Sequence, residues 1–132
     1  MTTIIGSVTL DRDMVFSNEY QYNLINASST PTIGGGIVIQ EFQRSEKGRF
    51  IDLTSEESIG LQKKSTVDSL LSLASLVSAT YLLTITSNSK TFIRSVRFRN
   101  EDTPIDFTPH QYREGLHSDD VWYKGTIRLM VV

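Results

Sequence analysis

The sequence predicts a mainly β fold of the α+β class, an antiparallel β-sandwich or open barrel with one short flanking α-helix. Several runs of β-branched and aromatic residues are separated by short polar turns, which is typical of strands joined in hairpins. Apolar residues recur at helical spacing in one segment only, between two predicted hairpins. The connections are too short for parallel crossovers, so we expect the strands to pair mostly antiparallel.

Composition narrows the classes of protein to consider. The 132 residues, 39% hydrophobic and 21% charged, predict one folded domain over residues 1–132. The absence of cysteine excludes disulfides, thiolate zinc sites and thiol nucleophiles. With 13 basic and 15 acidic residues the net charge is −2, so we expect no general attraction to nucleic acid or to anionic membranes. Neither a basic leader nor a long apolar run occurs, and we expect a protein made in the cytoplasm without membrane insertion.

The N-terminal third predicts short strands and a flexible loop. Residues Ile4 to Leu10 alternate loosely and predict a first strand, which the polar turn at 11–13 ends. Met14 to Phe16 predicts a second, short strand. The segment from Tyr20 to Ile33 starts with aromatic and aliphatic residues and continues into a polar run. We therefore expect an extended arm that leads into a flexible polar loop over about residues 26–33.

A first hairpin is predicted from Ile37–Phe42 and Arg49–Leu53. The first run is rich in β-branched residues, and the charged turn at Ser45–Gly48 suits an exposed connection. The run Gly34–Gly36 precedes the first strand, and we expect it to form a bend through which the chain enters the sheet.

One helix is predicted after the capping residue Ser65. Asp68 lies three positions further on, near the free N–H groups of the first turn. A helix of about three turns is too short to be stable alone, so its apolar stripe must pack on the sheet. The stripe contains Val67, Leu70, Leu71, Leu73, Ala74 and Val77.

A second hairpin is predicted from Tyr81–Thr86 and Thr91–Arg99, joined by the polar turn Ser87–Lys90. The apolar side chains on one face of the returning strand are those of Phe92, Val96 and Phe98. Arg94 interrupts this face. Either a bulge or a face buried only at one end would reconcile the pattern.

The C-terminal part predicts two further strands. Thr103–Pro109 has prolines near both ends, which favours an edge strand or an extended connector. Val121–Val132 alternates at Ile127, Leu129 and Val131, which predicts a strand inside a sheet.

Both histidines lie in a polar segment, for which we expect an exposed loop over about residues 110–120. His110 and His117, with Asp119 and Asp120, are suitable metal ligands by type. Positions so far apart within a loop impose no shared geometry, however. The sequence therefore favours a solvated loop without a metal site.

The sequence contains no catalytic constellation, and we expect neither an enzyme nor a bound cofactor. Its serines lack the Gly-x-Ser-x-Gly context of a nucleophile elbow. The run Gly34–Gly36 lacks the lysine of a phosphate-binding loop and precedes a strand, where such a loop would precede a helix. The carboxylate pairs Glu56–Glu57 and Glu101–Asp102 are adjacent in turns, where water solvates them.

Basic and aromatic residues are interleaved from Lys90 onward and leave two interpretations open. A strand that carries Arg94, Arg97 and Arg99 beside aromatic rings can bind single-stranded nucleic acid. The two phenylalanines of this strand fall on the face that the core requires, so we favour salt bridges from the arginines to acidic residues of a neighbouring subunit. A binding module for a small ligand or single-stranded nucleic acid is the alternative function.

A family resemblance adds to these inferences. The segments that carry it are Gly36–Glu41, Val67–Ala74, Ala79–Ile85, Thr91–Ile93, Val96–Arg99, Pro104–Pro109 and Trp122–Met130. Through their strand pattern and spacing, the chain from Gly35 onward resembles small tail and baseplate proteins of long-tailed, especially contractile-tailed, bacteriophages. Residues Arg94 and Ser95 resemble an insertion relative to that family, in agreement with a bulge.

The resemblance implies a non-enzymatic structural component of a phage tail tip or baseplate, similar in fold type to tail-tube proteins. Its partners would be other tail or baseplate proteins, joined in a ring or as a bracket, and its location the virion after assembly in the host cytoplasm. Because extended arms can add strands to a neighbour's sheet, we expect contacts on such arms and on exposed turns and strands. The candidate assembly contacts are Tyr20, Tyr22, Leu24, Ile25, Lys47, Arg49, Arg97 and Arg99.

Overall fold

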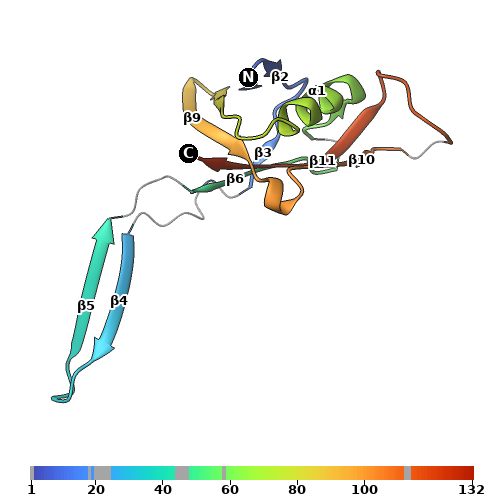
Figure 1. Ribbon diagram of the computed structural model, residues 1–132. Coiled ribbons are helices and arrows are strands. Elements are labelled where there is room, and N and C mark those ends of the chain that lie inside the picture. Colours follow the sequence, from blue (N-terminus) through green and yellow to red (C-terminus); the bar gives the residue numbers. More distant parts are fainter. Residues whose placement is uncertain (1, 18, 20–24, 44–47, 58, 112–113) are drawn as a thin grey trace.

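The computed structural model confirms the mainly β, α+β class. It describes residues 2–17, 19, 25–43, 48–57, 59–111 and 114–132, with backbone alone at 25–28 and 41–43. Within these residues the strands form one large open sheet and a separate two-stranded hairpin, and no barrel closes (Figure 1). The helix lies against one side of the large sheet.

Nine strands make up the large sheet. They are β1 (Thr2–Ile5), β2 (Val8–Thr9), β3 (Val15–Phe16), β6 (Phe50–Thr54), β7 (Gln62–Lys63), β8 (Tyr81–Ser87), β9 (Lys90–Phe98), β10 (Ile105–Pro109) and β11 (Trp122–Val131). The separate hairpin consists of β4 (Ile25–Pro31) and β5 (Ile37–Gln43). Helix α1 spans Lys64–Ala74, and the 3₁₀ turn η1 spans Asn100–Asp102.

The predicted C-terminal strand is confirmed as β11, which lies at the centre of the sheet. One of its edges pairs with β6 through residues 126–130 and with β7 through residues 122–123. Its other edge pairs with β10 through residues 123–127 and with β9 through residues 129–131. Within the described chain β10 pairs with β11 alone, so the prediction of an edge strand there is also confirmed.

One face of the sheet carries the core, because side chains alternate between the two faces along each strand. In β11, Ile127 and Leu129 are fully buried, whereas Arg128 between them points to the opposite face and is partly exposed. Helix α1 covers the core face and contributes Leu70 and Ala74. The other fully buried aliphatic side chains are Ile5, Ile51, Leu53, Leu83 and Val96.

The predicted helix is present, but Ser65 does not cap it. The helix begins at Lys64, and Lys63 in the N-cap position makes no side-chain capping bond. The predicted apolar stripe is buried only in part. Leu71 is 52% exposed, and Val77 lies beyond the last helical residue and is 92% exposed.

A carboxylate distant in sequence binds the start of the helix. Asp11 Oδ2 accepts the backbone N–H of Lys63 at 3.0 Å and the hydroxyl of Thr66 at 2.6 Å. Both donors belong to the first turn of α1 or to the residue before it. Asp11 thus fixes the start of the helix, whereas the N–H groups of Lys64 and Ser65 donate to the carbonyls of Val121 at 3.0 Å and Asp119 at 3.4 Å.

Gln62 fixes the loop that carries Asp11. Its side chain is completely buried, and its Oε1 accepts the Asp11 N–H at 2.8 Å. Its Nε2 donates to the carbonyl oxygens of Arg12 at 2.5 Å and Gly60 at 3.1 Å. One buried amide therefore joins the β2–β3 loop to the start of the helix. Its hydrogen bonds are made to backbone groups of the protein.

The first predicted hairpin is wrong in its pairing. Strand β5 pairs with β4 and not with Arg49–Leu53, which lies in β6 between β11 and β3. The loop expected over about residues 26–33 is strand as far as Pro31. Gly34–Gly36 belongs to the turn of this hairpin, where the Thr32 N–H donates to the Gly36 carbonyl at 2.8 Å. The polar composition of β4 predicted a loop, although the backbone of this segment pairs with β5 as a strand.

The second predicted hairpin is confirmed, without a bulge. Strands β8 and β9 pair residue for residue from Tyr81 opposite Val96 to Ser87 opposite Lys90. Asn88 and Ser89 form the turn with φ of 51° and 62°, the positive values that a two-residue hairpin turn requires. The apolar face of β9 is buried only at the end that pairs with β11. Of the two predicted explanations for Arg94 on this face, a bulge or burial at one end, the second is therefore correct.

Gly125 allows β10 and β11 to approach each other. A Cβ atom at this position would clash with the Asp106 carbonyl oxygen and would lie 2.7 Å from Phe107 Cα. On the other edge of β11, the Gly125 N–H donates to Ser55 Oγ at 2.6 Å, and its carbonyl accepts the Ser55 N–H at 2.9 Å. Gly125 is therefore held from both sides.

We predict that Gln62→Leu destabilises the fold by about 2 kcal/mol, because three backbone groups lose the hydrogen bonds that they make with a buried side chain. Chemical denaturation monitored by circular dichroism measures this loss. The control is Gln111→Leu at an exposed loop position, which should change the free energy of unfolding little. Equal stability of the two variants would contradict the role assigned to Gln62.

Gly125→Ala should also destabilise the protein, by about 1–3 kcal/mol, because the added methyl group forces two paired backbones apart. Thermal unfolding of the variant tests this. Gly34→Ala is the matched control, since nothing lies within 4 Å of a Cβ there. An unchanged midpoint for Gly125→Ala would show that β10 can move aside without cost.

Candidate assembly surfaces

We call residues 25–43, which form the β4–β5 hairpin, the arm. It shares no strand pairing with the large sheet within the described chain and extends away from it (Figure 1). Ile37 and Ile39 are 67% and 64% exposed, and Val38 is 46% exposed. An isolated two-stranded hairpin is marginally stable in water, and apolar side chains gain nothing while they face solvent. The arm is therefore a surface that a contact would stabilise.

The second surface is the face of the large sheet opposite the helix. It has two chemically different parts, which follow from the outward residues of successive strands. The ionic half lies over β6, β11 and the end of β9, and its charged members are Asp52, Arg97, Arg99, Glu101, Asp102, Asp106 and Arg128. The uncharged half lies over β1, β8 and the start of β9, and includes Ile4, Leu82, Thr84, Ile93 and Ser95.

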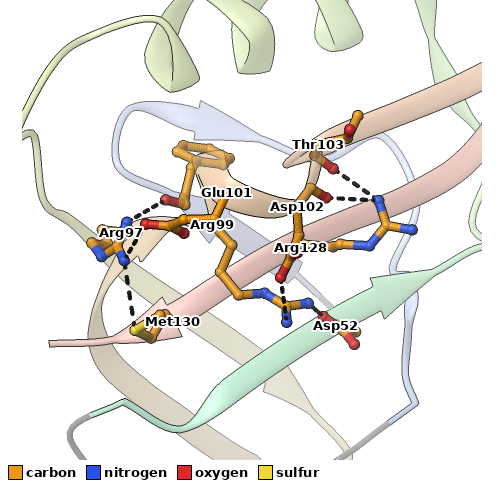
Figure 2. Close-up of polar contacts among 9 residues, drawn as sticks. Asp52, Arg97, Arg99, Glu101, Asp102, Thr103, Arg128 and Met130 are labelled. Atoms are coloured by element: carbon orange, nitrogen blue, oxygen red, sulfur yellow. Dashed lines mark hydrogen bonds and ion pairs between the residues drawn. The ribbon is translucent and has the colours of Figure 1, made fainter.

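Arg99 is at the centre of the ionic half (Figure 2). Its side chain is only 6% exposed and forms an ion pair with Asp52 of β6 and a second one, at 3.6 Å, with Asp102 of η1. Its guanidinium carbon also lies 4.2 Å from the ring centroid of Phe50. Arg99 thus joins β6 to the segment after β9, and its charge is compensated within the chain.

Arg128 and Arg97 extend the ionic half on both sides of Arg99. Arg128 donates to the carbonyl of Thr103 at 2.8 Å and lies 3.8 Å from the carboxylate of Asp106. Arg97 donates to Glu101 at 2.8 Å. These contacts hold η1 and the connection to β10 against the sheet.

The arginines of the ionic half lower the pKa of one carboxyl group, that of Glu101. The hydrogen bond from Arg97 holds the pKa of Glu101 below its ordinary value of 4.5, and the positive charges of Arg97 and Arg99 act in the same direction. A carboxyl group with a lowered pKa stabilises the folded state when it is ionised.

The uncharged half presents large apolar side chains among hydroxyl groups. Thr84 lies between Ile4 on β1 and Ile93 on β9 in one cross-strand row. Leu82, opposite Ser95 in the next row, is 56% exposed, and Ile93 is 47% exposed. Contiguous apolar groups on a sheet face are typical of an interaction surface.

Arg49, a predicted contact, is buried instead. Its side chain donates to the Glu19 carbonyl at 2.6 Å, and its guanidinium carbon lies 5.6 Å from the ring centroids of both Phe16 and Phe92. Both of these rings line a cavity of about 470 Å³. The cavity is lined by Asp13, Met14, Phe16, Glu19, Ile85, Ser87, Asn88, Lys90, Thr91 and Phe92.

The other predicted contact residues differ in their exposure and in their partners. Arg97 is partly exposed and Arg99 is buried, and both have carboxylate partners in the same chain, whereas we expected partners in a neighbouring subunit. Ile25 begins β4, on the arm. Tyr20, Tyr22, Leu24 and Lys47 lie outside the described residues.

The histidine segment is irregular wherever it is described between residues 110 and 120. His117 Nδ1 lies 3.2 Å from the hydroxyl of Tyr123, and its carbonyl accepts a bond from Lys64 Nζ at 2.7 Å. The described residues contain no group of three or more possible metal ligands.

Sequence reasoning did not find Asp52, Asp106 and Arg128. A signal was present, because Asp52 stands between two aliphatic residues of its strand, as Arg128 does in β11. Alternation indicates that such side chains point away from the core. It gives no indication that β6 and β11 are neighbours, so the pairing of these charges could not be predicted.

The chain matches no protein-family model, no curated protein and no solved structure. Among the described helical residues, none forms a helix long and apolar enough to span a membrane.

We predict that Glu101→Gln lowers stability in a pH-dependent way. Because the pKa of Glu101 is lowered in the folded state, its contribution is present above about pH 4.5 and is lost as the pH falls through the folded-state value. Urea unfolding at neutral and acid pH should show a wild-type advantage that disappears in acid. Glu114→Gln, which removes an exposed carboxylate elsewhere, is the control; a pH-independent difference for Glu101→Gln would contradict the ion pair.

Proposed function

We propose that this protein is a non-enzymatic structural component of a larger assembly, of the bacteriophage tail-tip or baseplate kind. The observation that carries the proposal is the arm, a hairpin outside the large sheet with exposed isoleucines. Natural proteins normally protect exposed strand edges and apolar strand surfaces, because these pair with other chains. A partner protein would provide that protection.

The resemblance to phage tail and baseplate proteins supplies the kind of assembly. It rests on strand pattern and spacing in the sequence. The partners would be other tail proteins or further copies of the chain, and the location the tail of the virion.

The ionic half supports a structural role over nucleic-acid binding. A phosphate backbone attracts uncompensated cations, whereas Arg97 and Arg99 each have a carboxylate within the chain. Small-ligand binding, the remaining alternative, is favoured by the cavity that Phe16 and Phe92 line. Pockets of about this volume accept small molecules, but both acidic and basic residues line this one, and Arg49 lies beside its two phenylalanine rings.

The proposal predicts that the chain is a constituent of phage particles. Mass spectrometry of purified particles from a phage that encodes the gene should find it in detached tails. A variant in which a short Gly-Ser turn replaces residues 25–43 should fold, because Ile25 and Gln43 are paired neighbours at the base of the arm, but should not be incorporated. Absence of the wild-type chain from particles, with recovery only from the soluble lysate, would refute the proposal.

A further inference from the structure

The composition of the arm indicates what kind of surface can bind it. From Tyr20 to Gln40 the sequence contains no charged residue. On the hairpin, Ile37 and Ile39 share one face, across from Pro31 and Ser29 respectively, and both are about two-thirds exposed. The opposite face presents Val38 across from Thr30 and is more polar. In the alternation of β5 the next position on the isoleucine face, toward the base of the arm, is Glu41, the one charged residue of the arm. The outer part of this face, with the two isoleucines, therefore favours a surface that is apolar and uncharged.

The chain itself provides such a surface in the uncharged half of its large sheet. Every outward residue there is aliphatic or carries a hydroxyl group, in contrast to the ionic half beside it. A carboxylate or guanidinium in this region would lose hydration under an apolar arm, and the described outward residues of β1, β8 and the start of β9 include neither. The match in charge is therefore specific to this half of the face.

The lengths of the strands are compatible with a contact between the arm and the uncharged half. Each arm strand has seven residues, which corresponds to about 23 Å of extended chain. Strands β8 and β9 are seven and nine residues long, so the outer part of the arm, from Ser29 to Gln40, can lie along them with Glu41 outside the contact. Two strands of this length cover an area below that of stable pairwise interfaces, and we expect a weak contact that several copies would reinforce.

We propose that the isoleucine face of the arm docks on the uncharged half of the large sheet of a second copy of this chain. The contact joins two different surfaces, so each copy offers one arm and one receiving face. Copies can then exchange arms reciprocally in a dimer or continue head to tail into a ring or filament. This inference deepens the proposed assembly function and rests on it.

Sedimentation over a range of protein concentrations tests the contact. The wild-type chain should self-associate, and the double variant Ile37→Thr/Ile39→Thr should weaken association about tenfold or more, since threonine keeps the β-branch and removes apolar contact. Val38→Thr, on the other face of the arm, is the matched control and should associate like the wild type. On the receiving face Leu82→Lys should abolish association, whereas Leu116→Lys, at a loop residue that is 97% exposed, should not.

A mixing experiment separates the contact from misfolding. The arm variant retains a receiving face and Leu82→Lys retains an arm, so the two should form a 1:1 dimer although neither associates alone. No dimer on mixing, or undiminished association of either variant, would overturn the inference. A wild-type chain that stays monomeric at all concentrations would also overturn it. If that monomer is nevertheless found in phage tails, the proposed function stands and the arm binds a different tail protein.

Discussion

The large sheet depends on the backbone pairing of β11. This strand pairs with β6 and β7 along one edge and with β9 and β10 along the other, and β1, β2, β3 and β8 reach it only through these neighbours. Without β11 the sheet would separate into smaller pieces with unpaired edges. The close approach at Gly125 follows from this position, because β10 and Ser55 reach the same residue from opposite sides.

The central position of β11 also determines how the open face is divided. Its outward residues Arg128 and Met130 lie opposite Asp52 and Phe50 of β6, so charge and polarity concentrate on that side of the sheet. Strands β1 and β8 lie beyond β9, far from these carboxylates in strand order, and carry outward aliphatic and hydroxyl groups. The three arginines on one side of the face therefore have carboxylate partners within the chain, and the outward residues of β1 and β8 on the other side carry no charge.

The local sequence pattern was sufficient to predict those strands and turns whose own residues favour the structure they adopt. Strand β11 alternates, the turn of β8–β9 contains residues that tolerate positive φ, and β10 is bounded by prolines. Prediction was wrong where pairing or capping partners are distant. The helix start is held by Asp11 and by the carbonyls of Asp119 and Val121, all more than fifty positions away. The pairing of β5 was misassigned because a polar β4 lacks the residues that usually indicate a strand.

The same distinction applies to the candidate surfaces. The sequence predicted an extended arm over Tyr20–Ile33 that leads into a flexible loop, whereas the structure has the β4–β5 hairpin at residues 25–43. The separation of this hairpin from the sheet is a property of topology. The arginines looked available for a neighbour because sequence does not show which carboxylates share their face. Once these charges are paired internally, the described surfaces that remain apolar, exposed and uncharged are the outer part of the arm, residues 29–40, and the uncharged half. Burial is the favourable state for such surfaces, and this requirement favours assembly over chemistry as the role of the chain.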